Sequence, residues 1–131
     1  MSIMDKSVVD AVGFSKDLQT EMFAIFDHLD WSEEEEHLYL LQEKINSYLV
    51  FIQEGQEGLS QKNKKNLKHA SRIVIEIWFK YQPSQECQGF LNRVQWRLKN
   101  MKNFEGIRKD KKLMKNAERL ENVEITYRVT G

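Results

Sequence analysis

Residues 32 to 55 read SEEEEHLYLLQEKINSYLVFIQEG, and this stretch decides the fold class. Its apolar residues recur at three- and four-residue steps, which is the spacing of one face of an α-helix. These residues are Leu38, Leu41, Ile45, Tyr48, Leu49 and Ile52. Ser32 and Glu35 match a capping box, and Gly55 is a typical helix terminator. The pattern predicts a long helix with one buried face.

Two β-strand patterns precede this helix. Residues 8–14 are rich in β-branched residues, and residues 20–29 carry apolar side chains on both faces. The segment 15–19 between them has turn-forming composition, so the two strands should form a hairpin.

Two more strands and a second helix follow. Residues 72–81 and 123–129 alternate apolar and polar side chains, as half-buried strands do. Pro83 and Ser84 open a helix, and a short helix across residues 110–120 fits the sequence before the last strand. The buried side of the second helix should carry Cys87, Leu91, Val94, Leu98 and Met101.

The element order is therefore ββαβαβ, with no internal repeat. It predicts a single α+β domain over residues 1–131. We expect two layers, with about four mainly antiparallel strands and two helices packed on one face. A domain of 131 residues buries roughly two-thirds of the surface of its unfolded chain, which is enough for a core.

The composition excludes several classes of protein. With 40% apolar and 31% charged residues, the chain is not of the disordered type. It has no run of about 18 apolar residues and no secretory leader pattern, so we expect a cytoplasmic protein that makes no use of a membrane. Cys87 is the only cysteine, which rules out an internal disulfide and a multi-thiolate zinc site within one chain, and its place on an apolar stripe predicts burial.

The formal net charge of zero hides a strong asymmetry. Residues 1–60 contain 13 Asp or Glu and 3 Lys or Arg, a net charge of −10, whereas residues 61–131 contain 7 and 17, a net charge of +10. The two halves either mix their charges on folding or present an acidic and a basic surface to different partners.

Histidine and carboxylate residues gather between residues 27 and 37. Such ligands suit zinc, manganese or iron, and a buried pair would suit general acid–base chemistry. The candidates are Asp27, His28, Asp30, Glu33 and His37. A solvated, capped helix start explains the same residues without chemistry. No metalloprotease, nucleophile or phosphate-loop signature is present, so the sequence favours a non-catalytic protein without a cofactor or bound metal; a metal-dependent enzyme at 27–37 is the third hypothesis.

The leading hypothesis is a protein-binding module. Its acidic half could cover a basic partner, as in an immunity protein or inhibitor, and a second copy of the chain is an alternative partner. The interface candidates are Asp27, His28, Asp30, Trp31, Glu33, Glu34 and Trp78. Trp78 should lie on the outer face of its strand, unless residues 102–121 fold over that face and bury it.

The alternative is a nucleic-acid-binding protein that uses the basic half. Lysine and arginine would contact phosphates, and Trp96 stands among them as a group that could stack on bases. The candidates are Lys62, Lys64, Lys65, Lys68, Arg93, Arg97, Lys109, Lys111 and Lys112. A solvated lysine surface accounts for the same composition, and a pI near 6.8 is low for a nucleic-acid module.

Two segments of the first half resemble a family of small bacterial proteins of unknown function. One is DHLDW followed by an acidic run and HLYLLQEKINSYLVFIQEGQ, over residues 27–56, and the other is VVDAVGFS at residues 8–15. The resemblance implies a bacterial cytoplasmic protein, and it offers no catalytic residues to transfer.

Overall fold

The computed structural model describes residues 3, 10–14, 20–53 and 72–130. Within these ranges four strands form one sheet in the order β1-β2-β3-β4. Their bounds are Ala11–Phe14 for β1, Thr20–Asp27 for β2, Arg72–Phe79 for β3 and Val123–Val129 for β4. The four predicted strands are therefore confirmed: β4 has the predicted bounds, β2 and β3 each end two residues early, and residues 8 and 9 of the first prediction lie outside the described residues.

The directions of the strands correct the expectation of a mainly antiparallel sheet. β1 and β2 form the expected antiparallel pair, but β2 with β3 and β3 with β4 are parallel. A parallel neighbour requires the chain to return to the edge at which the previous strand began, and a long helix supplies that return. β3 and β4 each follow a helix and each run parallel to the preceding strand, whereas β1 and β2 are antiparallel, so the sheet is mixed.

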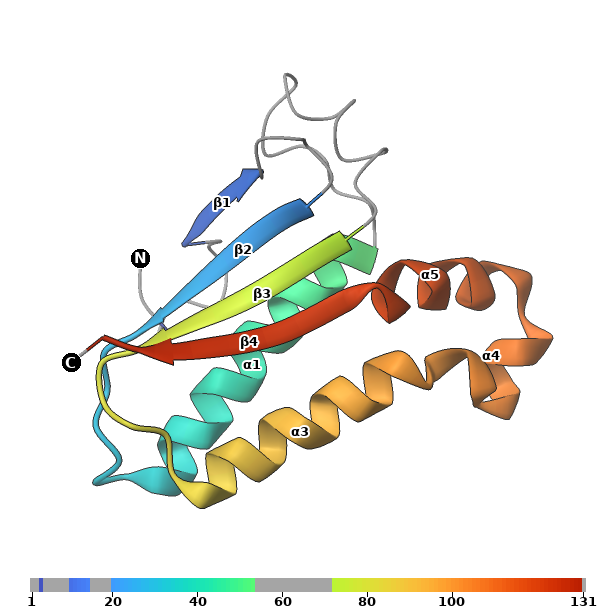
Figure 1. Ribbon diagram of the computed structural model, residues 1–131. Coiled ribbons are helices and arrows are strands. Elements are labelled where there is room, and N and C mark those ends of the chain that lie inside the picture. Colours follow the sequence, from blue (N-terminus) through green and yellow to red (C-terminus); the bar gives the residue numbers. More distant parts are fainter. Residues whose placement is uncertain (1–2, 4–9, 15–19, 54–71, 131) are drawn as a thin grey trace.

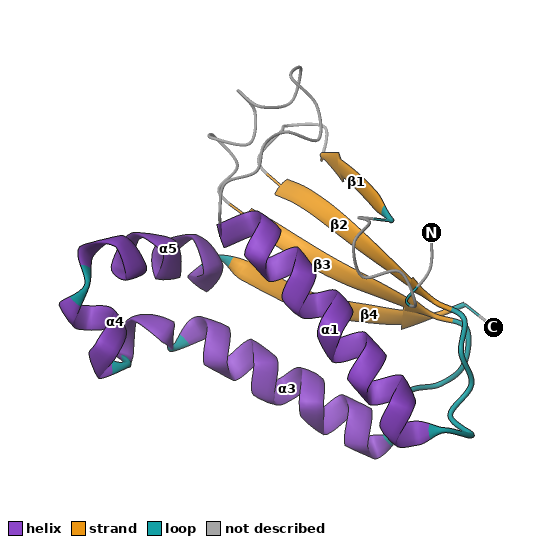
Figure 2. Ribbon diagram, turned by 180° about the vertical axis from the view of Figure 1, so that it is seen from behind, coloured by secondary structure: helices purple, strands orange, loops and turns teal. Residues whose placement is uncertain are grey.

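The described helices all lie on one face of the sheet (Figure 1 and Figure 2). α1 spans Glu34–Gln53 and α3 spans Gln85–Lys99. Figure 1 shows both behind or below the strands, and in Figure 2, from behind, they lie in front of the sheet. The predicted two-layer α+β arrangement is thus confirmed. Among the described residues, no helix has both the length and the apolar character that a bilayer crossing requires.

Three short helices connect α3 to β4. They are η2 at Met101–Asn103, α4 at Glu105–Lys109 and α5 at Lys111–Glu121. The expected helix across 110–120 is α5, with Asp110 accepting hydrogen bonds at its start. α5 contacts α1 and α3 on the helical side of the sheet. Residues 102–121 therefore do not fold over the face that carries Trp78.

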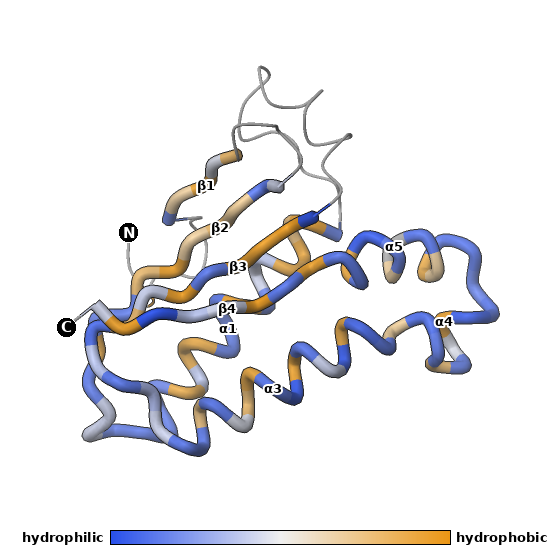
Figure 3. Tube along the Cα trace, viewed as in Figure 1, coloured by the Kyte–Doolittle hydropathy of each residue, from blue (hydrophilic) through white to orange (hydrophobic). Residues whose placement is uncertain are grey.

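The core lies between the sheet and the two long helices. The inner faces of β2 and β3 meet the apolar sides of α1 and α3, and Figure 3 shows the contrast between the hydrophobic strands and the mostly hydrophilic α4 and α5. Phe23, Ile25, Ile75, Ile77, Leu41, Ile45, Cys87, Leu91 and Leu98 are all buried there. The predicted helix stripes are confirmed at these positions.

The start of α1 differs from the expected capping box. The Ser32 hydroxyl donates a hydrogen bond of 2.6 Å to Asp30 Oδ1 and helix α1 begins only at Glu34. Ser84 has the role that we expected of Ser32, because its hydroxyl accepts a hydrogen bond from the Cys87 backbone N–H at the start of α3. The composition of a capping box is present at Ser32 and Glu35, but of the two long helices only α3 begins with a serine side chain that caps it.

Candidate functional site

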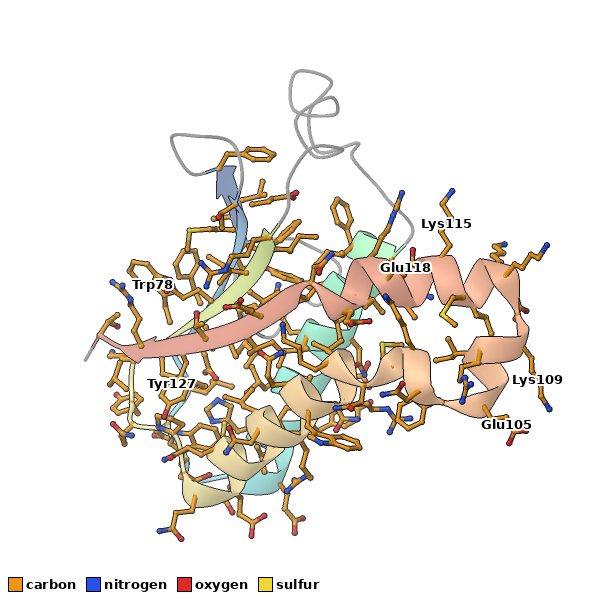
Figure 4. The ribbon with its side chains drawn as sticks, turned by 45° about the vertical axis from the view of Figure 1, so that its right-hand side comes forward. Trp78, Glu105, Lys109, Lys115, Glu118 and Tyr127 are labelled. Atoms are coloured by element: carbon orange, nitrogen blue, oxygen red, sulfur yellow. The ribbon has the colours of Figure 1, made fainter. Side chains whose placement is uncertain are left out.

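The outer face of the sheet presents an apolar surface around Trp78. The parallel register places Phe26 beside Trp78 and Met22 beside Val74, all on the side away from α1 and α3. Phe26 and Trp78 meet edge to face, with ring centroids 6.0 Å apart. We call Met22, Ala24, Phe26, Val74 and Trp78 the Trp78 face. No described element covers it, and Figure 4 shows Trp78 and Tyr127 on opposite sides of the β4 ribbon.

Charged side chains stand around the Trp78 face in balanced pairs. Arg128 lies over the Trp78 ring at 4.7 Å from its centroid, and its Nε is 3.6 Å from Glu76 Oε1. Arg72 and Glu124 form a second pair at 2.6 Å. That hydrogen bond lowers the pKa of the Glu124 carboxyl and raises the pKa of Arg72. Two cations and two anions give this rim a net charge of zero.

A shallow hollow lies where the Trp78 face reaches the carboxyl ends of the strands. Its volume is about 360 Å³ and it is open to solvent along one side. Phe26, Asp27, His28, Trp78, Lys80 and Thr130 line it. His28 is exposed at the end of β2 and Lys80 follows β3 directly, so the hollow combines aromatic rings with basic side chains. A partner side chain of moderate size would fit there.

The cluster between residues 27 and 37 is an internal clamp that closes the connection from β2 to α1. Asp27 Oδ2 lies 2.5 Å from His37 Nε2, and both side chains are buried. Asp27 Oδ1 accepts a hydrogen bond from the Leu29 N–H. The Trp31 ring stacks on the His37 imidazole, with centroids 3.6 Å apart. Four of the segment's residues therefore bind one another, and their polar atoms face inward.

Both ring nitrogens of His37 take part in the clamp. His37 Nδ1 lies 2.9 Å from the Asp30 carbonyl oxygen, which can only accept, so Nδ1 carries a hydrogen. His37 Nε2 and Asp27 Oδ2 lie within hydrogen-bond distance of each other, so both ring nitrogens are engaged inside the protein. Because solvent does not reach this pair, the arrangement orders the loop and offers no acid or base to an external substrate.

The exposed members of the cluster lie around the clamp. The hydroxyl and the backbone N–H of Ser32 both donate to Asp30 and lower the pKa of its carboxyl. Glu33 is exposed and Glu34 half-buried at the start of α1. The interface candidates are thus divided: His28 and Trp78 reach the hollow, Asp30 and Glu33 face solvent, and Asp27 and Trp31 serve the clamp.

Cys87 lies in the first turn of α3 and is fully buried, as predicted. Burial, with smaller contributions from Asp27 and Glu34, raises the pKa of its thiol to about 12. At neutral pH the group is a protonated thiol, which is a poor nucleophile and a poor metal ligand. Within the described ranges, no group of three His, Cys, Asp or Glu residues is arranged to hold a metal ion.

A second buried polar network was missed at the sequence level. Lys44 Nζ lies 3.0 Å from Asp10 Oδ1, and both side chains are fully buried. The Tyr48 hydroxyl accepts from the Asp10 N–H and donates to the Ala24 carbonyl oxygen at 2.6 Å. Burial raises the pKa of Tyr48. Lys44 occupies a position of the apolar stripe of α1, three residues after Leu41. That spacing could have predicted from the sequence that Lys44 is buried.

The basic candidates are distributed over α3, α4 and α5. Arg93 and Arg97 lie on the outer side of α3, and Lys111 and Lys112 are exposed at the start of α5. Lys109 forms an ion pair of 3.0 Å with Glu105, and both side chains are seen on α4 in Figure 4. The remaining candidates, Lys62, Lys64, Lys65 and Lys68, lie outside the described residues.

Comparison with known proteins gives a family but no described relative. No curated protein and no solved structure matches the chain. A family model described as a family of unknown function, DUF6572, matches residues 1–105. The match covers β1 through α3 and the whole of the Trp78 face, and it extends well past the residues on which the resemblance was first seen. The chain therefore belongs to this family of unknown function.

Proposed function

We propose that the chain is a non-catalytic protein-binding module that associates with a second copy of itself through the Trp78 face. The observation that carries the proposal is the outer side of the sheet, which no described element covers and where Met22 is 38% exposed, although Val74 beside it is 5% exposed. The apolar area that is still exposed on this face gains free energy when a second layer removes it from water.

The charges around the Trp78 face favour a second copy over a charged partner. An isologous contact brings the same surface to itself, so the surface must be self-complementary. The rim offers Arg72 and Arg128 against Glu76 and Glu124, and its net charge of zero gives no attraction to a strongly acidic or basic protein. Tryptophan and arginine are also the residues most often found at the energetic centre of interfaces.

The clamp and Cys87 support a role without catalysis. The imidazole of His37 and the carboxylate of Asp27 are closed from solvent, and the Cys87 thiol is protonated at neutral pH. Of the candidates for chemistry, Asp27 and His37 are therefore occupied in holding the loop before α1.

The proposal is tested by sedimentation equilibrium on the full chain. We expect a dimer at about 50 μM protein, the range of a modest association. Met22→Glu should give a monomer, because the dimer would bury a carboxylate on each side of the apolar contact. Val50→Glu on α1 is the matched control, since Val50 is equally apolar and exposed but lies away from the sheet.

Two results would contradict the proposal. The first is a wild-type chain that is still a monomer at about 200 μM. The second is a dimer that survives Met22→Glu but dissociates with Val50→Glu, which would place the contact on the helical side. In the first case the exposed acidic start of α1 becomes the surface on which to test the inhibitor hypothesis.

A further inference from the structure

The outer side of α3 carries a tryptophan where a helix normally shows polar residues. Trp96 is 62% exposed, the largest value among the exposed apolar side chains of the described residues. It lies about 140° around the helix from Leu91 and about 160° from Leu98, which are both buried, so it is on the solvent side. Because no described element packs on it, the indole face is available to a ligand.

The charged residues of α3 around Trp96 are all basic, although Lys102, just beyond the helix, pairs with Glu118 and Glu121 of α5. From Cys87 to Asn103 the charged residues are Arg93, Arg97, Lys99 and Lys102, all basic. Arg93 and Arg97 form no ion pair within the described part of the chain, and the Arg97 guanidinium lies over the Phe104 ring at 5.4 Å. Two arginines near an open indole are thus free to bind an anionic group.

The acidic part of the molecule is too far away to cancel this charge. Glu34 lies near Cys87 at the first turn of α3, and Trp96 is nine residues further along the helix. Nine residues of helix measure about 14 Å, which exceeds the screening length of about 8 Å at physiological salt. The acidic start of α1 therefore does not cancel the charge of Arg93 and Arg97, and the nearer carboxylates Glu118 and Glu121 of α5 are paired with Lys102.

We propose that the outer side of α3 binds single-stranded nucleic acid. A base stacks on the Trp96 indole, and the flanking phosphates contact Arg93 and Arg97. Stacking requires an open base face, which a single strand offers and an intact duplex does not. Exposed cations at the start of α5, Lys111 and Lys112, extend the path of the backbone. The carboxylates of an acidic protein could pair with Arg93 and Arg97, but they would not stack on the Trp96 indole as a base does.

The experiment measures fluorescence anisotropy of a labelled single-stranded DNA of about 15 nucleotides with the full chain. We expect binding at about 50 mM salt that weakens steeply toward about 200 mM as phosphate contacts are screened. Trp96→Ala should weaken binding about tenfold, and Trp96→Phe should retain most of it. Arg93→Gln with Arg97→Gln should reduce the slope of log Kd against log salt by about 1.4, since each phosphate contact to a single strand contributes about 0.7.

Tyr39→Ala is the matched control. Tyr39 is 58% exposed on α1, beside the glutamates, so its truncation removes a comparable ring without touching α3. Its affinity should equal that of the wild type, and circular dichroism should show that all variants are folded.

Three results would overturn the proposal. The first is no binding at about 50 mM salt with about 100 μM protein. The second is equal binding by Trp96→Ala and the wild type. The third is binding of duplex DNA or of polyglutamate as tightly as the single strand, which would mean that α3 attracts anions in general and that no base stacks on Trp96.

Discussion

At the scale of single residues, the two buried charges of α1 show how polar groups are accommodated in this core. Lys44 and His37 face inward on the same side as Leu41 and Tyr48. Each has a carboxylate partner from another segment, Asp10 for Lys44 and Asp27 for His37. A buried charge is tolerated when it is paired and hydrogen-bonded, so both pairs attach α1 to the N-terminal half of the sheet.

Replacing Lys44 should destabilise the protein strongly. Lys44→Met fits a similar volume but leaves the Asp10 carboxylate buried without its cation, which costs about 3–5 kcal/mol. Urea unfolding followed by circular dichroism measures the loss. The double variant Asp10→Asn with Lys44→Met should recover part of it, because no charge is then left in the core.

The control for Lys44 is Lys115→Met, which changes an exposed lysine of α5 and should alter the free energy of unfolding by less than about 0.5 kcal/mol. A loss of similar size at both lysines would show that the Lys44–Asp10 pair has no special role.

At the scale of elements, the starts of the two long helices differ although their sequences look alike. The Ser84 hydroxyl accepts from the N–H of Cys87, whereas the Ser32 hydroxyl donates to Asp30 before α1 begins. The reason is that Asp30 offers a carboxylate two residues away, and a local side-chain partner competes with the backbone N–H groups of the helix.

Ser84→Ala should cost about 1 kcal/mol of stability, since the first turn of α3 loses an acceptor for a backbone N–H. Ser32→Ala should cost clearly less by the same urea measurement, because it removes only an exposed bond in the loop. Equal losses would mean that Ser32 caps α1 after all. The Ser32 variant should also raise the pKa of Asp30, which proton NMR titration can follow.

At the scale of the whole molecule, β3 should be the part of the mixed sheet that opens least often. β3 is hydrogen-bonded to β2 on one side and to β4 on the other along nearly its whole length, and helices cover its inner face. β1 is a four-residue edge strand, and α4 is a short helix with no buried residue. Stability against local opening should therefore fall outward from the centre of the sheet.

Native-state hydrogen exchange should show this order. We expect the slowest amides in β3 and in the adjacent part of β2, at Ile75, Ile77 and Ile25, and exchange at least about a hundredfold faster in β1 and α4. Two-dimensional NMR in deuterated buffer is the measurement. Slower exchange in α5 than in β3 would contradict the view that the sheet is the most stable part.

The sequence by itself determined the elements and their faces. Residues 72–81 alternate and residues 38–52 repeat at helical steps, and such periodicity is a property of each segment alone. The buried stripes followed from it, and with the turn composition of residues 15–19 so did the antiparallel pairing of β1 and β2. The candidate Trp78 was placed on the outer face of its strand for the same reason.

Only the tertiary structure decided which segments are neighbours. Strand direction depends on the path of each connection, and no described helix covers the Trp78 face because α5 packs against α1 and α3 instead. The clamp at Asp27 and His37 and the pair of Asp10 with Lys44 join residues 10 and 34 positions apart. A local sequence pattern cannot predict a contact at that separation. A charged side chain can be buried only when the fold places an oppositely charged partner beside it.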